Sequence, residues 1–275
     1  MKINKTNIAF FSFVHFIGLI GIIMICLNKG NTNTLIFAFF LLNAGGLSIT
    51  IGYHRLFTHK SFECHSIVKL FLLIFASTTF QDSAMVWCRD HRLHHRYNDT
   101  KKDPYGINRG FWGAHFKWIL VTEKKPPFIS ILADLTEDKL ILFQHRYYLP
   151  LAVFFTFITP ILACALWNDL VGGFFIACGL RLVILYHCTW LINSACHTYG
   201  KRKYQATSAR DNWLLALLTW GEGYHNYHHA HPIDYRNGWR WYHYDPSKWL
   251  IKGMSFLKLT QNLKTVDAER QKKAH

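Results

Sequence analysis

Three short clusters of histidines are the residues of this sequence best able to do chemistry. Eight of the 17 histidines fall in H-R-L-F-T-H, R-D-H-R-L-H-H and G-Y-H-N-Y-H-H, as His54, His59, His91, His94, His95, His225, His228 and His229. Positions i, i+3 and i+4 share one face of a helix, so each H-x-x-H-H can direct two or three imidazoles at one point. Residues five apart are about 140° apart on an α-helix. His54 and His59 should therefore straddle a cavity or lie where a helix ends.

Metal binding is the chemistry that these clusters predict. Imidazoles fill apolar cores poorly, and buried polar groups need partners. The clusters contain no cysteine, which disfavours iron–sulfur clusters and structural zinc and leaves iron, copper, zinc or nickel. His197, in N-S-A-C-H, is a ninth candidate ligand and lies one helical turn beyond Asn193.

The number of histidines favours two metal ions. Nine imidazoles suit two ions of higher coordination than tetrahedral zinc, each with room for water or dioxygen. Asn193 could hold one such water. The carboxylates that could orient the imidazoles from behind, or could equally be solvated surface charges, are Asp90, Asp99, Asp103 and Glu222.

The remaining histidines are isolated in the sequence. We expect them to be ordinary core or surface residues: His15, His65, His115, His145, His187, His231, His243 and His275. Arg181 is different, because it lies midway along an apolar block, where a charge is by default a functional candidate. The sequence assigns it no role.

Four apolar blocks are long enough to cross a bilayer and must position the histidines. They cover residues 8–27, 34–53, 149–167 and 170–191. A secretory signal is the alternative for the first block, but no small-residue cleavage site precedes the second. Residues 67–80 are too short for a comfortable span, and we place them at the membrane interface or in a shallow re-entrant position. Residues 213–220 resemble an amphipathic segment on the membrane surface.

The charge pattern predicts the orientation of these spans. The net charge is +15, and nearly all Lys and Arg fall in residues 55–146 and 201–273 or at the N-terminus. The positive-inside rule therefore places both termini and the histidine clusters in the cytoplasm. The same charge could attract anionic lipid headgroups or a phosphate-bearing substrate. No recognition motif accompanies it, so no nucleic-acid partner is expected.

The sequence thus predicts an all-α integral membrane protein. Four transmembrane helices carry a cytoplasmic helical cap, residues 54–147 and 192–263, in one membrane-embedded domain of residues 1–263. Residues 264–275 are expected to be a loose tail. The membrane would be the cell inner membrane in a bacterium or the endoplasmic reticulum in a eukaryote.

From about Asn43 to Lys252 the chain resembles the membrane acyl-CoA desaturases of the stearoyl-CoA, delta-9 type. The resemblance depends on the three clusters and their spacing from the membrane pairs. It also depends on W-x-R-D-H-R-x-H-H-x-Y, D-P-Y followed by R-G-F, N-S-x-x-H-x-Y-G, G-E-G-Y-H-N-Y-H-H and D-Y-R-N-G-W-R-W-Y-H-Y-D-P-S-K-W. These motifs occur together and in order, which makes the resemblance specific.

The resemblance implies a fold and a set of site residues. It implies four membrane helices beneath a cytoplasmic cap, nine histidines binding two iron ions, Asn193 contacting one iron through water, and a bent tunnel for the acyl chain. The residues that would shape the bend are Gln81, Trp87, Thr189 and Trp190, and Arg89 would meet the phosphates of the carrier. Lys124 and Lys125 resemble a basic carrier-binding pair, but V-T-E-K-K departs from the family pattern. An acyl chain on a lipid or a carrier protein therefore stays open beside acyl-CoA.

The expected reaction is the dioxygen-dependent insertion of a cis double bond into a saturated acyl chain. Hydrogen removal from a methylene is beyond side-chain acids and bases, so the metal centre must supply the oxidising power. Electrons are expected from an external donor such as a cytochrome b5 or ferredoxin system. The alternatives are a histidine-box hydroxylase or monooxygenase and, from another class, a metal transporter, which would carry its ligands within the spans.

Overall fold

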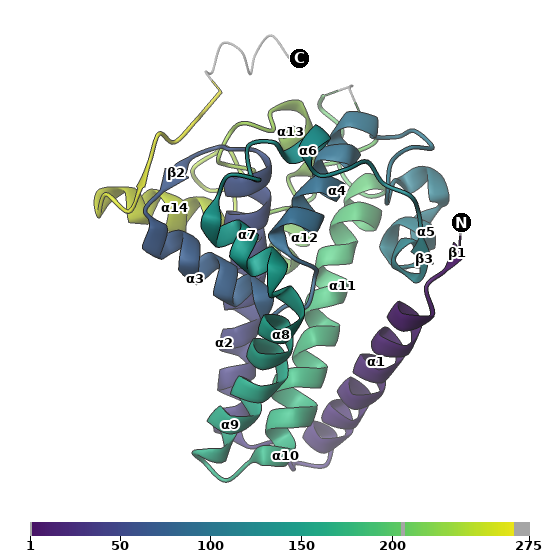
Figure 1. The fold of residues 1–275 in the computed structure, drawn as a ribbon, viewed down its shortest axis with the longest axis vertical. Helices are drawn as coiled ribbons and strands as arrows, with labels where there is room; N and C mark the ends of the chain where they lie inside the picture. Colours follow the sequence, from purple (N-terminus) through teal and green to yellow (C-terminus); the bar gives the residue numbers. More distant parts are fainter. Residues whose placement is uncertain (1, 205–206, 267–275) are drawn as a thin grey trace.

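The computed structural model describes residues 2–204 and 207–266. Four helices in it are long and apolar enough to cross a membrane, which identifies an integral membrane protein: Lys5–Cys26, Thr32–Thr58, Tyr148–Ala165 and Leu170–His197. They form a narrow bundle, and shorter helices gather at its wide end (Figure 1). The predicted all-α membrane fold with four spans is confirmed.

Three of the four spans contain a π-helical segment. The first span is the α-helix α1 (Lys5–Cys26), and the second joins α2 (Thr32–Ser48) to the π-helix η1 (Ile49–Thr58). The third comprises α8 (Tyr148–Val153), the π-helix η4 (Phe154–Ile158) and α9 (Thr159–Ala165). The fourth comprises α10 (Leu170–Gly172), the π-helix η5 (Gly173–Leu180), α11 (Arg181–Ser194) and the 3₁₀ segment η6 (Ala195–His197). The second and fourth helices extend beyond the predicted ends at residues 53 and 191. These extensions contain His54 and His197, which therefore lie beyond the apolar blocks.

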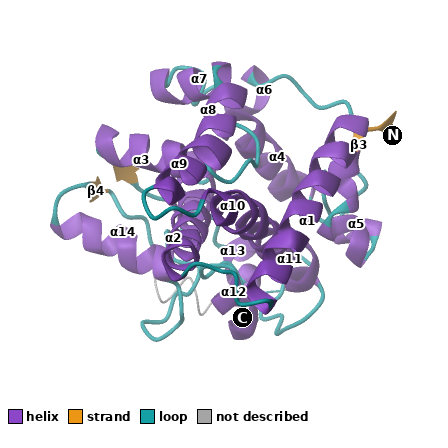
Figure 2. Ribbon diagram, turned by 90° about the horizontal axis from the view of Figure 1, so that it is seen from below, coloured by secondary structure: helices purple, strands orange, loops and turns teal. Residues whose placement is uncertain are grey.

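Glycines allow α1 to approach the fourth span closely. A Cβ atom on Gly21 would lie 2.5 Å from the carbonyl oxygen of Phe175, and one on Gly179 would lie 2.7 Å from the side chain of Ile17. Only a residue without a side chain permits such an approach between membrane helices. The first half of α1, by contrast, leans away from the bundle (Figures 1 and 2).

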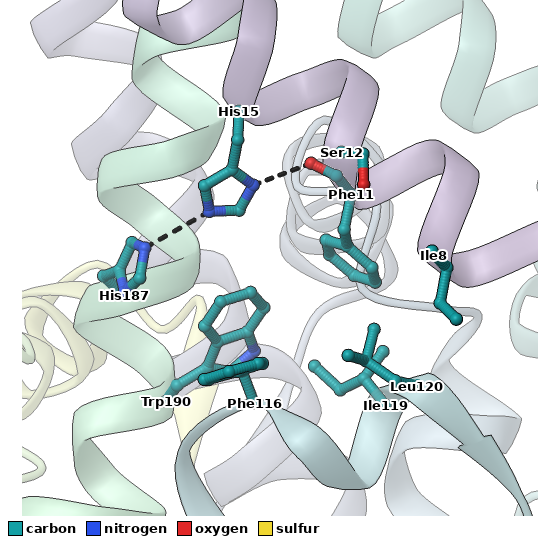
Figure 3. A pocket seen from close by; sticks show the side chains of 9 residues that line it. All are labelled: Ile8, Phe11, Ser12, His15, Phe116, Ile119, Leu120, His187 and Trp190. Carbon is teal, nitrogen blue, oxygen red and sulfur yellow. Dashed lines mark hydrogen bonds between the residues drawn. The ribbon is translucent and has the colours of Figure 1, made fainter. Parts of the chain in front are cut away.

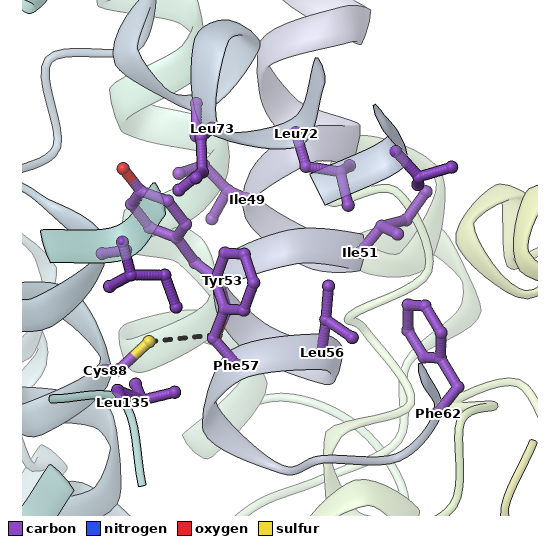
Figure 4. Close-up of a cluster of buried hydrophobic side chains, with 14 of the residues drawn as sticks. Ile49, Ile51, Tyr53, Leu56, Phe57, Phe62, Leu72, Leu73, Cys88 and Leu135 are labelled. Atoms are coloured by element: carbon purple, nitrogen blue, oxygen red, sulfur yellow. Dashed lines mark hydrogen bonds between the residues drawn. The ribbon is translucent and has the colours of Figure 1, made fainter. Parts of the chain in front are cut away.

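The wide end is built from two stretches of chain. The first contains α3 (Ser66–Ser77), α4 (Ala84–Tyr97), η2 (Ile107–Arg109), α5 (Phe111–His115), η3 (Lys117–Leu120), α6 (Ile129–Leu132) and α7 (Lys139–Arg146). The second contains α12 (Trp213–Leu218), α13 (His225–Ala230) and α14 (Pro246–Phe256). Figure 4 shows the apolar cluster that joins η1 to α3 and α4 through Tyr53, Phe57, Leu72 and Cys88.

Two short antiparallel pairs of strands attach distant segments to this end. Strand β1 (Lys2–Ile3) pairs with β3 (Val121–Thr122), and β2 (Glu63–Cys64) pairs with β4 (Thr260–Gln261). Lys264 continues the attachment, because its N–H donates to the Ser61 carbonyl oxygen and its own carbonyl accepts from Tyr235 N–H. The first residues of the predicted loose tail are therefore bonded to the domain, and residues 267–275 lie outside the described part.

The two short apolar segments have amphipathic surfaces. Helix α3 exposes Ile67, Leu70 and Phe71, and it does not reach the narrow end of the bundle. Helix α12 exposes Trp213 and three leucines. Both segments have the apolar face that the predicted interfacial position requires, and that position stays a prediction.

Arg181 joins three segments within the bundle and is 2% exposed. Its guanidinium donates to the carbonyl oxygens of Ala177 at 2.9 Å, Thr78 at 2.6 Å and Thr156 at 3.4 Å. Thr78 follows the end of α3, where carbonyls lack helical partners, and Thr156 lies in the π-helix η4. The residue to which the sequence assigned no role therefore satisfies backbone acceptors.

Candidate metal centre

Four elements bring the nine predicted histidines to the wide end of the bundle. His54 lies in η1, and His59 is the residue that follows its last turn. Helix α4 carries His91, His94 and His95, η6 carries His197, and α13 carries His225, His228 and His229. All of them are buried or nearly so. The sequence clusters therefore converge, as their spacing predicted.

The π-helix corrects the expected relation between His54 and His59. A π-helix bonds residue i to residue i+5, so residues five apart lie near the same face, unlike in an α-helix. The His59 N–H donates to the His54 carbonyl oxygen at 3.1 Å, and the two ring centroids are 4.8 Å apart. The pair does lie where a helix ends, but on one side of it and in contact, because η1 is not α-helical.

The nine imidazoles separate into two groups. Within each group, every histidine offers one ring nitrogen that lies within 4.8 Å of those of the other members. The first group contains His54, His59, His91, His95 and His228, and the second contains His94, His197, His225 and His229. Several Nε2 atoms face each other directly. His228 Nε2 is 3.0 Å from the Nε2 atoms of both His54 and His95, and His229 Nε2 is 3.1 Å from His225 Nε2.

Polar groups behind the imidazoles decide which ring nitrogen carries the proton. His94 Nδ1 lies 2.9 and 3.0 Å from the Asp103 carboxylate oxygens, so it donates to them and leaves Nε2 as a lone pair. His197 Nδ1 lies 2.8 Å from Ser208 Oγ, whose own proton is donated to Asp99. Both Nε2 atoms are therefore available as metal ligands.

Buried ring nitrogens without a partner indicate that these sites fit a metal. Among the described residues, His59 Nε2, His91 Nε2 and His197 Nε2 are buried and have no hydrogen-bond partner. Such groups are costly unless something binds them. One cation in each group would satisfy these lone pairs, and five and four neutral imidazoles form donor sets suited to iron, zinc or copper.

Burial also holds the imidazoles in the form that binds metals. It lowers the pKa of His91 and His228 well below the usual range, and the neighbouring imidazoles lower it further. The pKa values of His95, His225 and His229 are lowered for the same reasons. Ligand imidazoles must be neutral, so these pKa values favour metal binding at neutral pH.

A buried charged network supports the first group. Glu222 Oε2 lies 3.0 Å from His54 Nδ1, and Glu222 Oε1 accepts from Arg55 at 3.0 Å. Arg55 is 1% exposed and also pairs with Asp245. Burial alone would raise the pKa of Glu222, but His54 and Arg55 hold it below its usual value. Three of the four carboxylates considered from the sequence thus support the histidines; Asp90 instead pairs with Arg89 and Lys125.

A cavity of about 550 Å³ reaches both histidine groups. Its wall includes His54, His91, His225 and Asn193, and also all five residues predicted to bind substrate. Gln81 Nε2 lies 3.5 Å from Thr189 Oγ1, the Trp87 ring stacks on His91, and Trp190 stacks on Tyr186. Arg89 lies on the wall as well, where its guanidinium contacts Asp90 and the Phe128 ring.

Sequence reasoning missed several residues that support the site. Tyr105 Oη contacts His91 Nδ1 at 3.0 Å, and its motif D-P-Y marked the segment without giving the tyrosine a role. Asp211 Oδ1 accepts from the N–H groups of Asn226 and Tyr227, which fixes the start of α13. Ser208 and Asp211 have no local signal, because both act from a loop between His197 and the last histidine cluster, and that loop carries no recognisable motif.

Comparison with known proteins agrees with this geometry. The family model described as fatty acid desaturase matches residues 32–255. A probable acyl-CoA desaturase of Schizosaccharomyces pombe is 46% identical over 246 residues, covering 88% of this chain and 51% of that protein. Acyl-CoA desaturase 1 of Saccharomyces cerevisiae is 41% identical over 84% of this chain and 46% of its own length. The chain thus spans about half the length of these two relatives.

Stearoyl-CoA desaturase of Sus scrofa is 38% identical over 268 residues, covering 94% of this chain and 74% of that protein. The family match includes all three histidine clusters and His197, and so all of the imidazoles that the fold brings together. With that match and this relative, the chain belongs to the fatty acid desaturase family.

Proposed function

We propose that this protein is a fatty acyl desaturase that inserts a cis double bond, at the delta-9 position, into a saturated acyl chain carried by coenzyme A. The observation that carries the proposal is one cavity that has apolar walls, reaches both imidazole groups and has cationic side chains elsewhere on its wall. The proposal also draws on the relatives, which are named acyl-CoA and stearoyl-CoA desaturases.

We further propose that the two imidazole groups hold two iron ions. His54, His59, His91, His95 and His228 would bind one ion, and the other would be bound by His94, His197, His225 and His229, with Asn193 contacting it through water. When bound, the iron pair supplies the activation of dioxygen that hydrogen removal from a methylene requires. The neutral imidazoles and the carboxylates behind them suit this role.

The protein's own contribution is to hold the acyl chain and to exclude water. Trp87 stacks on His91 at the cavity wall, so a chain passing Trp87 lies beside the metal centre. The contact between Gln81 and Thr189 would fix the bend of the chain, and therefore which two carbons are presented. Trp190 and Tyr186 would close the apolar side and keep bulk water away.

Cationic groups on the same cavity are the proposed recognition site for the carrier. Arg89 and Lys125 share Asp90, which lies on the cavity wall between them. Phosphates of coenzyme A would compete with Asp90 for these cations, because phosphate is a strong acceptor for Arg and Lys. Lys124, the other half of the predicted basic pair, is exposed.

We also propose a membrane location and an orientation for the enzyme. Residues 1–263 would form one membrane-embedded domain with the metal centre and both termini on the cytoplasmic face, as the positive-inside rule predicts. In a eukaryotic cell this membrane would be the endoplasmic reticulum. Electrons would come from a separate donor of the cytochrome b5 or ferredoxin type.

Expression in a desaturase-deficient host tests the proposal. Mass spectrometry of the host lipids should find new monounsaturated chains with the double bond at carbon 9. His94→Asn should abolish them, whereas His65→Asn, at an exposed histidine outside the cluster, should not. A product that gains an oxygen atom would indicate a hydroxylase instead. Purified protein that still desaturates after complete removal of iron would contradict the metal assignment.

A further inference from the structure

A second, smaller cavity lies between the first half of α1 and helix α11. Its volume is about 340 Å³, and Figure 3 shows the residues that line it. Most of the wall is apolar, and the polar side chains on it are His15, His187 and Ser12. The wall shares Phe11, Ile119 and Trp190 with the larger cavity. These two histidines are outside the nine-histidine centre.

A chain of hydrogen bonds fixes the proton on His187. The Ser194 hydroxyl donates to the Trp190 carbonyl oxygen at 3.0 Å, so its oxygen accepts from His115 Nδ1 at 2.9 Å. His115 Nε2 is then a lone pair and accepts from His187 Nδ1 at 3.1 Å. Burial lowers the pKa of His115, which keeps that imidazole neutral. His187 therefore presents an unprotonated Nε2 to the cavity.

His15 presents an unprotonated nitrogen to the same point. Its Nδ1 lies 2.7 Å from the Phe11 carbonyl oxygen, which can only accept, so Nδ1 carries the proton. His15 Nε2 and His187 Nε2 are 3.3 Å apart (Figure 3). Two lone pairs cannot form a hydrogen bond with each other. A positive ion between them would satisfy both.

We propose that His15 and His187 form a second metal site, separate from the nine-histidine centre and suited to a tetrahedral ion such as Zn²⁺. With metal–nitrogen bonds of about 2.0–2.1 Å, a separation of 3.3 Å corresponds to a nitrogen–metal–nitrogen angle of about 105–110°, close to tetrahedral. Phe11 and His115 provide the outer hydrogen bonds that metal-binding imidazoles generally have.

The cavity leaves two positions of such an ion open. None of the nine residues that line it carries a carboxylate, so the protein does not neutralise the charge of the ion. The open positions therefore favour an anionic oxygen ligand, such as hydroxide or the carboxylate of a lipid whose apolar part lies in the cavity.

Occupation of this site would link α1 to α11 beside a wall of the larger cavity. The His15 ring is nearly parallel to Trp190, with centroids 6.4 Å apart, and His187 packs edge-on against the same indole. A metal bridge would therefore hold Trp190 in place from outside the larger cavity. The linkage also joins the half of α1 that leans away from the bundle to its neighbour.

Zinc binding by the full-length, iron-loaded protein in detergent tests the site. After equilibration with Zn²⁺ and gel filtration, the wild type should retain about one zinc per chain with its iron content unchanged. His15→Asn and His187→Asn should each lower zinc affinity at least tenfold, whereas His65→Asn should match the wild type. Unchanged iron in the variants shows that they are folded.

Cobalt provides a second readout that does not depend on the variants. Co²⁺ bound to the iron-loaded wild type should give the visible absorption of a tetrahedral site with nitrogen ligands. Zinc retained equally by the wild type and both variants would overturn the proposal. So would the absence of any zinc in the wild type, because the two nitrogens would then share only a proton.

Discussion

Asp103 lies behind His94 with both carboxylate oxygens within 3.0 Å of Nδ1, and it is fully buried. Replacing it with asparagine keeps the size but removes the charge that fixes the ring. We expect Asp103→Asn to lower iron affinity or desaturation 10- to 100-fold, the usual range for residues behind metal-bound histidines. Iron per chain and product per hour, measured on the same purified sample, check this.

Glu137→Gln is the matched control for that substitution. Glu137 is an exposed carboxylate outside the metal centre, so its loss should change neither iron content nor rate. Equal iron content and equal rate in Asp103→Asn and Glu137→Gln would show that Asp103 does not orient His94.

Asp211 predicts a pH dependence of stability. Burial raises its pKa to about 6, although the N–H groups of Tyr227 and Asn226 oppose the shift. An acid with a raised pKa contributes stability at low pH that is lost as the pH rises through the folded value. Asp211→Asn keeps the acceptor oxygen without the buried charge. The variant should therefore melt higher than the wild type at pH 7.5, and the gap should narrow towards pH 5.

Thermal unfolding in detergent at several pH values measures that gap. The comparison uses the difference in melting temperature between the variant and the wild type. Protonation of the histidines changes both melting temperatures and therefore cancels. A gap that is constant or widens towards pH 5 would mean that Asp211 is charged throughout this range.

Clustering in the sequence was enough to predict eight of the nine histidines, and His197 was a separate candidate because it lies one helical turn beyond Asn193. Clustering did not predict how they divide into groups, since that depends on helices far apart in the chain. The same limit applies to the contact between His15, His115 and His187, which the sequence did not predict. Each is isolated in sequence, and only the fold brings the three together.

At the scale of elements, the sequence did not predict where the membrane-spanning helices end. Hydropathy located the four apolar blocks, but η1 and η6 continue the helices into polar sequence. The π-helical bonding of η1 is a tertiary outcome, because α-helical periodicity is the default that sequence patterns assume. The side chains of His54 and His59 were therefore expected to point to different sides of the helix, whereas in η1 they lie on the same side.

Close packing of α1 against the fourth span predicts a sensitive glycine. A methyl group at Gly21 would meet the Phe175 carbonyl oxygen, which is backbone and cannot move easily. We expect Gly21→Ala to destabilise the protein by about 1–3 kcal/mol through overpacking. The thermal midpoint in detergent should fall accordingly.

Gly253 offers the matched control within a helix. A Cβ there would meet nothing within 4 Å, and its backbone conformation suits any residue. Gly253→Ala should stabilise α14 by up to about 1 kcal/mol. A fall of similar size in both variants would indicate that the loss of glycine itself, rather than the contact with Phe175, causes the effect.

At the scale of the whole molecule, β1 and α14 lie at the same end of the bundle as the histidines (Figure 1). An even number of crossings requires this, and the positive-inside rule predicts that this end is cytoplasmic. Epitopes at the N- and C-termini should both be accessible to antibody from the cytosolic side of sealed vesicles. An epitope inserted after Lys29, in the turn between the first two spans, should be accessible only after permeabilisation.

If either terminal epitope required permeabilisation, the orientation would be wrong even though the helices themselves were placed correctly. The sequence sufficed to predict the four spans because apolar length acts over many residues at once, and the orientation stays a prediction. It could not supply the attachments made by β1 with β3 and by β2 with β4, which depend on two residues per strand.

The π-helical segments in three spans have a consequence for how the protein matures. Insertion into a bilayer requires only that each segment be apolar and bond its own backbone, which an ordinary α-helix does best. In η4 the Thr156 carbonyl oxygen accepts from Arg181 of the fourth span, and this bond forms only when the third and fourth spans pack together. We therefore expect η4 to take its final form after insertion, during assembly of the bundle, and a substitution at Arg181 to weaken the packing of the third span against the fourth.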